Sequence, residues 1–156
     1  MDVPSRIHFY SAATGVSFEL PPGFEVGLQD ARSAQYELRD DDDEQVLVRI
    51  VIARPDVGGA AVRTVAEAFA NTAGDLIEER LTVIDDCPTA TVVVHLPNGV
   101  AGATPVTGPG SDDLMAHFTA AQFNGAVRTV TAFASWADRD EWIPIFDEAV
   151  ASCRFL

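Results

Sequence analysis

Residues 114–136 contain the strongest hairpin signal in the chain, the dipeptide Asn124-Gly125 between two long strand-like runs. Asparagine and glycine readily take the left-handed backbone conformation of the two-residue turns that join antiparallel strands. Segments 33–55 and 77–97 repeat this plan, each with a cluster of acidic residues at the expected turn. Long paired strands of this kind predict a well-twisted antiparallel sheet.

Two other segments have the 3.6-residue rhythm of amphipathic helices. In 62–75 and in 137–155, apolar side chains recur at i, i+3, i+4 and i+7, so each segment has one buried stripe. Thr64 and Glu67 have the spacing of an N-terminal capping box, and Gly74 is the expected end of the first helix.

The order of the elements predicts an α+β fold. Strands, one helix, two further hairpins and a C-terminal helix give a twisted antiparallel sheet of about six or more strands flanked by two main helices. The second helix should hold Pro144 within its first turn or kink there, because proline has no backbone N–H. The 156 residues fit one domain, residues 1–156, and the glycine- and proline-rich segment 97–113 is a long loop within it, since too little chain follows for a second core.

The formal net charge of −14 restricts the class of partner. It comes from 24 acidic residues against 10 basic ones, all of them arginine. A surface this negative repels phosphate backbones and anionic lipid, so we expect no nucleic-acid binding, whereas a basic protein partner or a cation stays open. No apolar run approaches the roughly 18 residues of a membrane span, and the first residues, MDVPSRIHFY, do not resemble a signal peptide, so the expected location is the cytoplasm.

The stretch GVSFELPPGF, residues 15–24, ends a short strand abruptly. Val16, Phe18 and Leu20 alternate toward the interior, and two prolines and a glycine follow at once. Proline cannot donate to a strand ladder and glycine accommodates the bend, so the strand stops and Phe24 turns toward the core or its rim.

This stretch, the order of elements after it and the ending S-x-R-F at 152–155 resemble the PsbP/MOG/LpqN-like superfamily. The superfamily includes the extrinsic photosystem subunit, the Ran-binding nucleotide-release factor, actinobacterial LpqN-type lipoproteins and DcrB-like chaperones. The resemblance spans about residues 8–155 and implies an α/β/α sandwich with non-enzymatic binding or assembly roles. The chain differs from LpqN-type lipoproteins because it shows neither an export signal nor a lipidated cysteine.

The densest charge cluster is the expected turn after residue 39. Its members are Asp40, Asp41, Asp42, Asp43 and Glu44. Carboxylates of this density suit Ca²⁺ or a basic partner, but the spaced ligands and central glycine of an EF-hand loop are missing. A solvated turn is the favoured interpretation, and the aspartates are a weak metal candidate only.

Histidines and cysteines give no metal or redox motif. His8, His95 and His117 fall on three separate expected strands without HxH or HExxH spacing, so separate structural roles are favoured over a zinc site. Cys87 and Cys153 are expected as two reduced thiols, one near a turn and one on a helix face, although the sequence leaves a disulfide between them open. We expect no cofactor.

The candidate binding surface is a rim of aromatic side chains. Trp136 and Trp142 lie at the junction of the last strand and the last helix, and together with Phe24 and loop 97–113 they would border a groove between sheet and helices. Arg49 interrupts an otherwise apolar strand; it would pair with a facing acid or line a pocket, but a position at an edge or toward solvent is favoured.

The preferred function is a non-enzymatic binding or chaperone-like module that captures a protein segment or an apolar ligand. One alternative is a metal-dependent or small-molecule enzyme that uses loop 97–113 with His95, His117 and nearby acids. Another is a structural subunit of a larger assembly. A homodimer is a further option, because an exposed sheet edge invites self-pairing.

Overall fold

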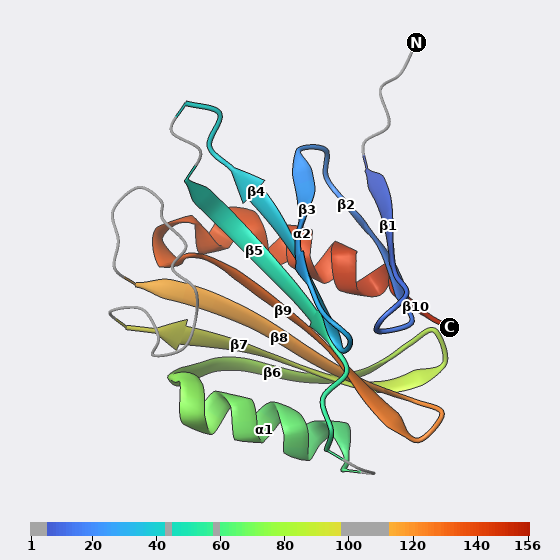
Figure 1. Cartoon of the computed structure of the whole chain (residues 1–156). Coiled ribbons are helices and arrows are strands. Elements are labelled where there is room, and N and C mark those ends of the chain that lie inside the picture. Colours follow the sequence, from blue (N-terminus) through green and yellow to red (C-terminus); the bar gives the residue numbers. More distant parts are fainter. Residues whose placement is uncertain (1–5, 43–44, 58–59, 98–112) are drawn as a thin grey trace.

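The structure is a computed structural model that describes residues 6–42, 45–57, 60–97 and 113–156. In these residues the main element is a seven-stranded antiparallel sheet (Figure 1). The order across this sheet is β3 (Phe24–Gln29), β4 (Ser33–Arg39), β5 (Val46–Ala53), β9 (Ala126–Ser135), β8 (Leu114–Phe123), β7 (Cys87–Leu96) and β6 (Asp75–Ile84). A smaller sheet has the order β1 (Ile7–Ser11), β2 (Val16–Leu20) and β10 (Arg154–Phe155). The helices are α1 (Val62–Ala73) and α2 (Arg139–Ala151), and a 3₁₀ turn, η1 (Trp136–Asp138), precedes α2.

All three predicted hairpins are confirmed: β4 with β5, β6 with β7, and β8 with β9. Asn124 and Gly125 have φ values of 51° and 75°, as a two-residue hairpin turn requires. Asp85 and Asp86 join β6 to β7 with φ values of 51° and 61°. The side chains of aspartate tolerate this left-handed conformation, which explains an acidic pair at so tight a turn.

Each face of the large sheet packs against one helix. α1 lies on β6, β7 and β8 and buries the alternate residues Val92, Val94 and Leu96 of β7. α2 packs on β8, β9 and β2 over the opposite face, where Val93 of β7 is buried. The predicted α+β fold with flanking helices is therefore confirmed, and no helix in the described part of the chain is long and apolar enough to cross a membrane.

The small sheet shares the core on the α2 face. Val16, Phe18 and Leu20 are at most 1% exposed, so the predicted inward alternation of β2 is confirmed. Gly23 has a φ of 107°, a conformation that favours glycine, and the chain then turns into β3. Phe24 follows in the core, as predicted.

The predicted capping box of α1 is wrong. The helix begins at Val62 with Ala61 as its N-cap residue, which provides no side-chain hydrogen bond. Thr64 consequently lies inside the first turn instead of ahead of it, and Glu67 accepts a hydrogen bond from Nε of Arg63 at 2.9 Å. The predicted end of the helix at Gly74 is confirmed.

Of the two alternatives predicted for Pro144, its place within the first turn of α2 is wrong, and a kink at Pro144 stays a prediction. The η1 turn leads directly into α2, so the helix begins at Arg139 and Pro144 is its sixth residue. Because proline has no N–H, the carbonyl of Asp140 one turn earlier receives no hydrogen bond from it. Asp140 is exposed, so this carbonyl lies where water is available.

Candidate functional site

Two hollows flank the C-terminal half of α2. The larger, of about 740 Å³, lies between α2 and β6, and the smaller, of about 390 Å³, lies between α2 and the strands β1 and β2. Ala151 and Arg154 line both hollows, which therefore adjoin at the end of the helix. α2 packs on β8 and β9, and the two hollows lie on either side of the helix, beyond these strands.

The α2–β6 hollow has a mixed lining. One wall is a run of five consecutive residues of β6, from Arg80 to Ile84, and Thr91 of β7 lines it as well. The other wall is α2 with Asp147 and Val150. Apolar, hydroxyl and charged groups of both signs thus face one space, which fits a peptide better than a purely hydrocarbon ligand.

A network of three hydrogen-bonded side chains, Arg80, Asp147 and His117, connects the two walls of this hollow. Nη2 of Arg80 donates to Oδ1 of Asp147 at 2.6 Å, and Nε2 of His117 lies 2.7 Å from the same oxygen. The side chain of His117 is 1% exposed, and its Nδ1 has no hydrogen-bond partner among the described residues. Asp147 is therefore the link that joins β6, β8 and α2.

The pKa values reflect this arrangement. Burial alone would raise the pKa of the Asp147 carboxyl, but the hydrogen bonds from His117 and Arg80 outweigh it and hold the pKa below its ordinary value. The hydrogen bond to Asp147 raises the pKa of Arg80. Both groups are therefore charged at neutral pH.

Replacing Asp147 with alanine is expected to lower the free energy of unfolding by about 1–3 kcal/mol at pH 7, because the buried Nε2 of His117 loses the carboxylate that it contacts. A carboxyl whose pKa is lowered on folding stabilises the fold above its unfolded value of about 3.9, and this contribution disappears as the pH falls through the lower folded value. Urea unfolding at a series of pH values gives the free energy of unfolding of the parent and of Asp147→Ala. The two values should converge only below about pH 4.

Glu148→Ala, which removes an exposed ion pair with Arg6, is the control and should lower the free energy of unfolding by about 0–1 kcal/mol. A difference in the free energy of unfolding between the parent and Asp147→Ala that does not change with pH would contradict the role given to the Asp147 charge.

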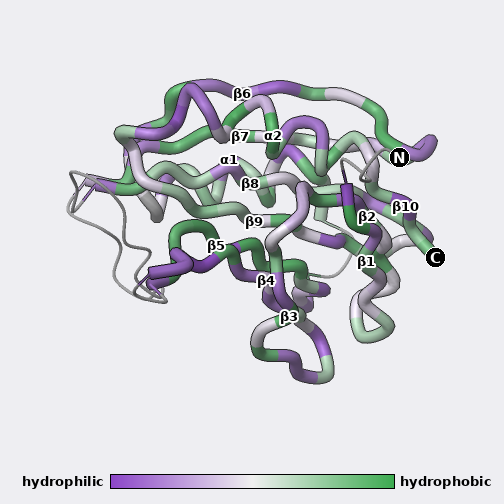
Figure 2. Tube along the Cα trace, turned by 90° about the horizontal axis from the view of Figure 1, so that it is seen from above, coloured by the Kyte–Doolittle hydropathy of each residue, from purple (hydrophilic) through white to green (hydrophobic). Residues whose placement is uncertain are grey.

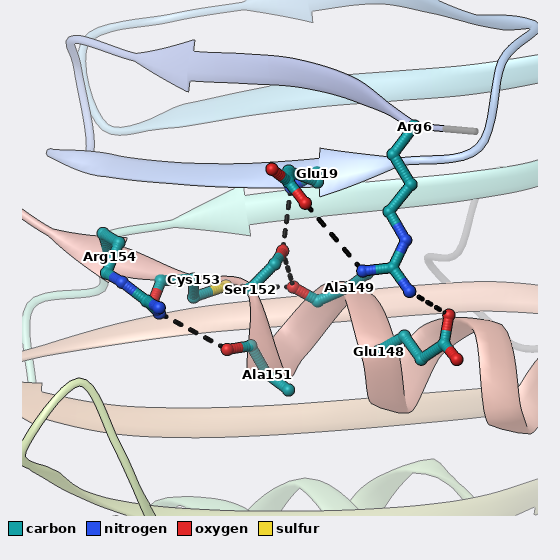
Figure 3. A network of polar contacts seen from close by, with 8 residues as sticks. All are labelled: Arg6, Glu19, Glu148, Ala149, Ala151, Ser152, Cys153 and Arg154. Carbon is teal, nitrogen blue, oxygen red and sulfur yellow. Dashed lines mark hydrogen bonds and ion pairs between the residues drawn. The ribbon is translucent and has the colours of Figure 1, made fainter. Parts of the chain in front are cut away.

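The smaller hollow is bordered by polar contacts that fasten the end of α2 to the small sheet (Figure 3). Arg6 forms ion pairs with Glu148 and, at 3.8 Å, with Glu19 of β2. Oγ of Ser152 accepts a hydrogen bond from the backbone N–H of Glu19 at 2.8 Å. Nη1 of Arg154 donates to the carbonyl of Cys153 at 2.7 Å. These contacts fix the wall that the two hollows share.

The structure does not bring the predicted aromatic rim together at either hollow. Phe24 is 8% exposed and packs edge-on against Trp142, with ring centres 6.3 Å apart. Trp136 lies between the ring of His95, at 3.9 Å, and the guanidinium of Arg139, at 4.2 Å. None of these three aromatic residues lines the hollows beside α2. A binding role for them stays a prediction, and most of loop 97–113 lies outside the described residues.

The favoured position of Arg49 is wrong. Arg49 lies on β5, between β4 and β9, and is only 7% exposed. Directly opposite on β4, Glu37 accepts a hydrogen bond from Nη2 of Arg49 at 3.2 Å, which is the pairing with a facing acid considered as the alternative. An arginine is tolerated in this interior position because the cross-strand carboxylate neutralises it.

The other candidates have different partners. Asp40, Asp41 and Asp42 form the predicted hairpin turn, while Asp43 and Glu44 lie outside the described residues. Nε2 of His95 lies 3.0 Å from Oδ2 of Asp113, whereas His117 on the neighbouring strand contacts Asp147. In the described part of the chain no group of three or more histidine, cysteine, aspartate or glutamate residues is placed to hold a metal ion.

Both cysteines are free and buried. Cys87 begins β7 beside the turn, as predicted, but Cys153 lies just past the end of α2 and not on the helix itself. Burial raises the pKa of Cys87, and burial raises the pKa of Cys153 to about 12. Both thiols are therefore protonated at neutral pH and are poor nucleophiles.

Comparison with known proteins identifies the fold. No family model and no curated protein matches the chain. The solution structure of cyanobacterial PsbP (CyanoP) from Synechocystis matches 99% of this chain and 95% of its own, with 14% identity and a TM-score of 0.63. A point mutant of the protein Mog1 matches 96% of this chain and 95% of its own, with 11% identity and a TM-score of 0.62. LpqN of Mycobacterium tuberculosis, described as involved in cell envelope biogenesis, matches 95% of this chain and 88% of its own, with 7% identity and a TM-score of 0.54.

These three structures confirm the predicted PsbP/MOG/LpqN-like fold over nearly the whole chain. At such low identities the likeness concerns the fold alone. One fold hosts unrelated functions, so the function has to be argued from the residues of this chain.

Proposed function

We propose that this protein is a non-enzymatic binding module that captures a segment of another protein in the α2–β6 hollow. The observation that carries the proposal is the hollow of about 740 Å³, which lies against five consecutive residues of a strand at the edge of the sheet. Its volume falls within the range of about 300–1,000 Å³ that is usual for ligand sites.

The lining favours a peptide over an apolar small molecule. Arg80, Asp147 and Thr91 provide charged and hydroxyl groups, while Ile84 and Val150 provide apolar surface. A peptide offers both backbone polar groups and side chains to such a mixture. The network of Arg80, Asp147 and His117 keeps these groups in fixed positions, which lowers the entropic cost of binding.

The other sequence-based hypotheses stay predictions. The enzyme alternative depends on loop 97–113, of which residues 98–112 lie outside the described part of the chain. The cytoplasmic location, the role as a subunit of an assembly and homodimer formation also stay predictions. The shared fold with CyanoP, Mog1 and LpqN supports none of these over the others.

Site-specific photo-crosslinking in the native host tests the proposal. p-Benzoylphenylalanine is introduced in place of Thr82, which is exposed on β6 and lies on the face of the strand that lines the hollow. The matched control carries it in place of Val26, which is 53% exposed on β3 at the opposite edge of the sheet. We expect a protein crosslinked through Thr82 and not through Val26, and mass spectrometry of the crosslinked peptide identifies the segment.

A third variant fills the hollow. Ala151 is exposed and lines both hollows, so Ala151→Trp should remove the Thr82 crosslink while the unfolding midpoint stays close to that of the parent. Crosslinks of equal yield from Val26, or a Thr82 crosslink that survives Ala151→Trp in a folded protein, would contradict the proposed site.

A further inference from the structure

β6 is an edge strand of the large sheet, and no strand of the described residues pairs with its outer side. In the described residues it pairs with β7 alone, at one end of the sheet. Figure 2 shows β6 along one margin of the molecule, with β3 near the opposite margin. In an antiparallel ladder alternate residues direct their N–H and C=O groups away from the partner strand, so this margin offers unpaired backbone donors and acceptors.

The side chains of β6 divide between two faces. Arg80, Thr82 and Ile84 pair with the residues of β7 that face α2, and they line the hollow. Leu81 and Val83 lie on the other face and are 58% and 65% exposed. Glu79 shares their face. One strand therefore combines a free edge, two exposed apolar side chains and one acid in alternate positions.

The second half of β6, from Leu81 to Ile84, has no charge, proline or bulge that would hinder pairing with another strand. Natural edge strands are protected against pairing by charges, prolines or bulges. The segment from Leu81 to Ile84 contains no charge and no proline, and the single register shift lies between Leu76 and Glu78 at the other end of the strand. An unprotected edge of this kind is a template for an incoming strand.

Charge decides which strand fits. The chain carries a net charge of −14, and a second copy would bring the same charge to the contact. In a two-fold pairing of β6 with itself, registers centred on Glu79 or on Arg80 also place like charges directly opposite each other, which is unfavourable. A basic segment is attracted instead, and a basic side chain opposite Glu79 gains a cross-strand ion pair.

We propose that β6 binds an extended basic segment of a partner protein as an additional antiparallel strand. The segment has three residues at alternate positions that face this strand: an apolar residue opposite Val83, an apolar residue opposite Leu81 and a basic residue opposite Glu79. Its intervening side chains enter the hollow beside α2. This inference rests on the proposed function and names the partner's chemistry and its mode of binding.

Short peptides test the pattern. The probe is an acetylated and amidated seven-residue peptide with valine at its second and fourth positions, lysine at its sixth and threonine elsewhere. In an NMR titration of the ¹⁵N-labelled protein, we expect the amide signals of residues 79–83 to shift. The peptide with glutamate in place of lysine should bind about two- to fivefold more weakly at low salt, and the difference should shrink at high salt.

Glu79→Lys tests the charge pairing from the protein side. The Glu79 side chain is 26% exposed and pairs with Arg63 at 3.4 Å, a contact at the surface, so the fold should tolerate the change. The variant should prefer the glutamate peptide over the lysine peptide, which inverts the order found for the parent. An unchanged order would overturn the assignment of Glu79.

N-methylated peptides test strand addition without altering the protein. Only alternate amides of an added strand donate to β6, so methylating one set of alternate amides should weaken binding more than tenfold and methylating the other set should not. Equal binding of both methylated peptides would overturn strand addition.

The outcomes separate the two proposals. Shifts at Asp147, Val150 and Ala151 without shifts on β6 would overturn strand addition and leave capture in the hollow standing. No shift anywhere with millimolar peptide, or a dimer in sedimentation equilibrium that is abolished by Leu81→Lys, would overturn the basic segment as the occupant. The crosslink from Thr82 would then decide the proposed function on its own.

Discussion

Replacing Glu37 with leucine is expected to lower the free energy of unfolding by about 3–5 kcal/mol. Glu37 is 6% exposed on β4 and is the acid that neutralises Arg49, itself 7% exposed on β5. Nε and Nη1 of Arg49 have no hydrogen-bond partner among the described residues, so without Glu37 the guanidinium is a buried charge with no compensation. Removal of one member of a buried pair costs more than the pair itself contributes.

The reciprocal variant separates this explanation from a simple loss of packing. Arg49→Met leaves Glu37 with a second partner, because Nη2 of Arg39 lies 2.9 Å from the carboxylate, so it should cost clearly less than Glu37→Leu. The double variant Glu37→Leu/Arg49→Met should regain most of the lost stability, since two apolar residues replace two buried charges. Guanidinium unfolding of the four proteins measures this cycle. A double variant no more stable than Glu37→Leu alone would contradict the electrostatic explanation.

Phe18→Ala is expected to destabilise the fold by about 3–5 kcal/mol, the cost of a cavity at a fully buried phenylalanine. Phe18 is 1% exposed, and its ring centre lies 4.9 Å from Tyr36 of β4 and 5.8 Å from Phe9 of β1. These rings join the small sheet to the large one. The small sheet should therefore lose stability together with the rest of the protein in a single transition.

Tyr10→Ala is the matched control. Tyr10 lies on β1, next to Phe9, but it is 54% exposed, so its removal should change stability by no more than about 0.5 kcal/mol. Unfolding followed by circular dichroism and by tryptophan fluorescence measures both variants. Two separate transitions in Phe18→Ala would contradict the view that the two sheets share one core.

Local signals predicted the fold because they act between neighbours in the sequence. Asn124-Gly125 specifies a tight turn by backbone conformation alone, and the alternation in β2 specifies which side chains are buried. The helix starts were predicted less well. Capping depends on where the backbone becomes helical, and at α1 that point is Val62, two residues before the threonine that the pattern favoured as the cap.

The candidate site could not be predicted in the same way, because its walls come from β6, β7 and α2 and meet only in the fold. Arg80 and Asp147 are 67 positions apart, and neither stands out in its own segment. Arg49 was placed wrongly for the same reason, since its neutralising partner lies on another strand. The sequence did contain one usable signal. The run from Leu81 to Ile84 has apolar residues on both faces of a strand, whereas a strand with one buried face needs them at alternate positions only.

Hydrogen–deuterium exchange on the complex with the segment captured through Thr82 tests the central claim most directly. If the segment adds to β6 and fills the hollow, exchange should slow at residues 79–84 of β6 and at the α2 residues beside the hollow, while β3 exchanges as in the free protein. Protection confined to β3 or to the small sheet, or unchanged exchange along β6 in a saturated complex, would contradict the claim that the α2–β6 hollow is the binding site.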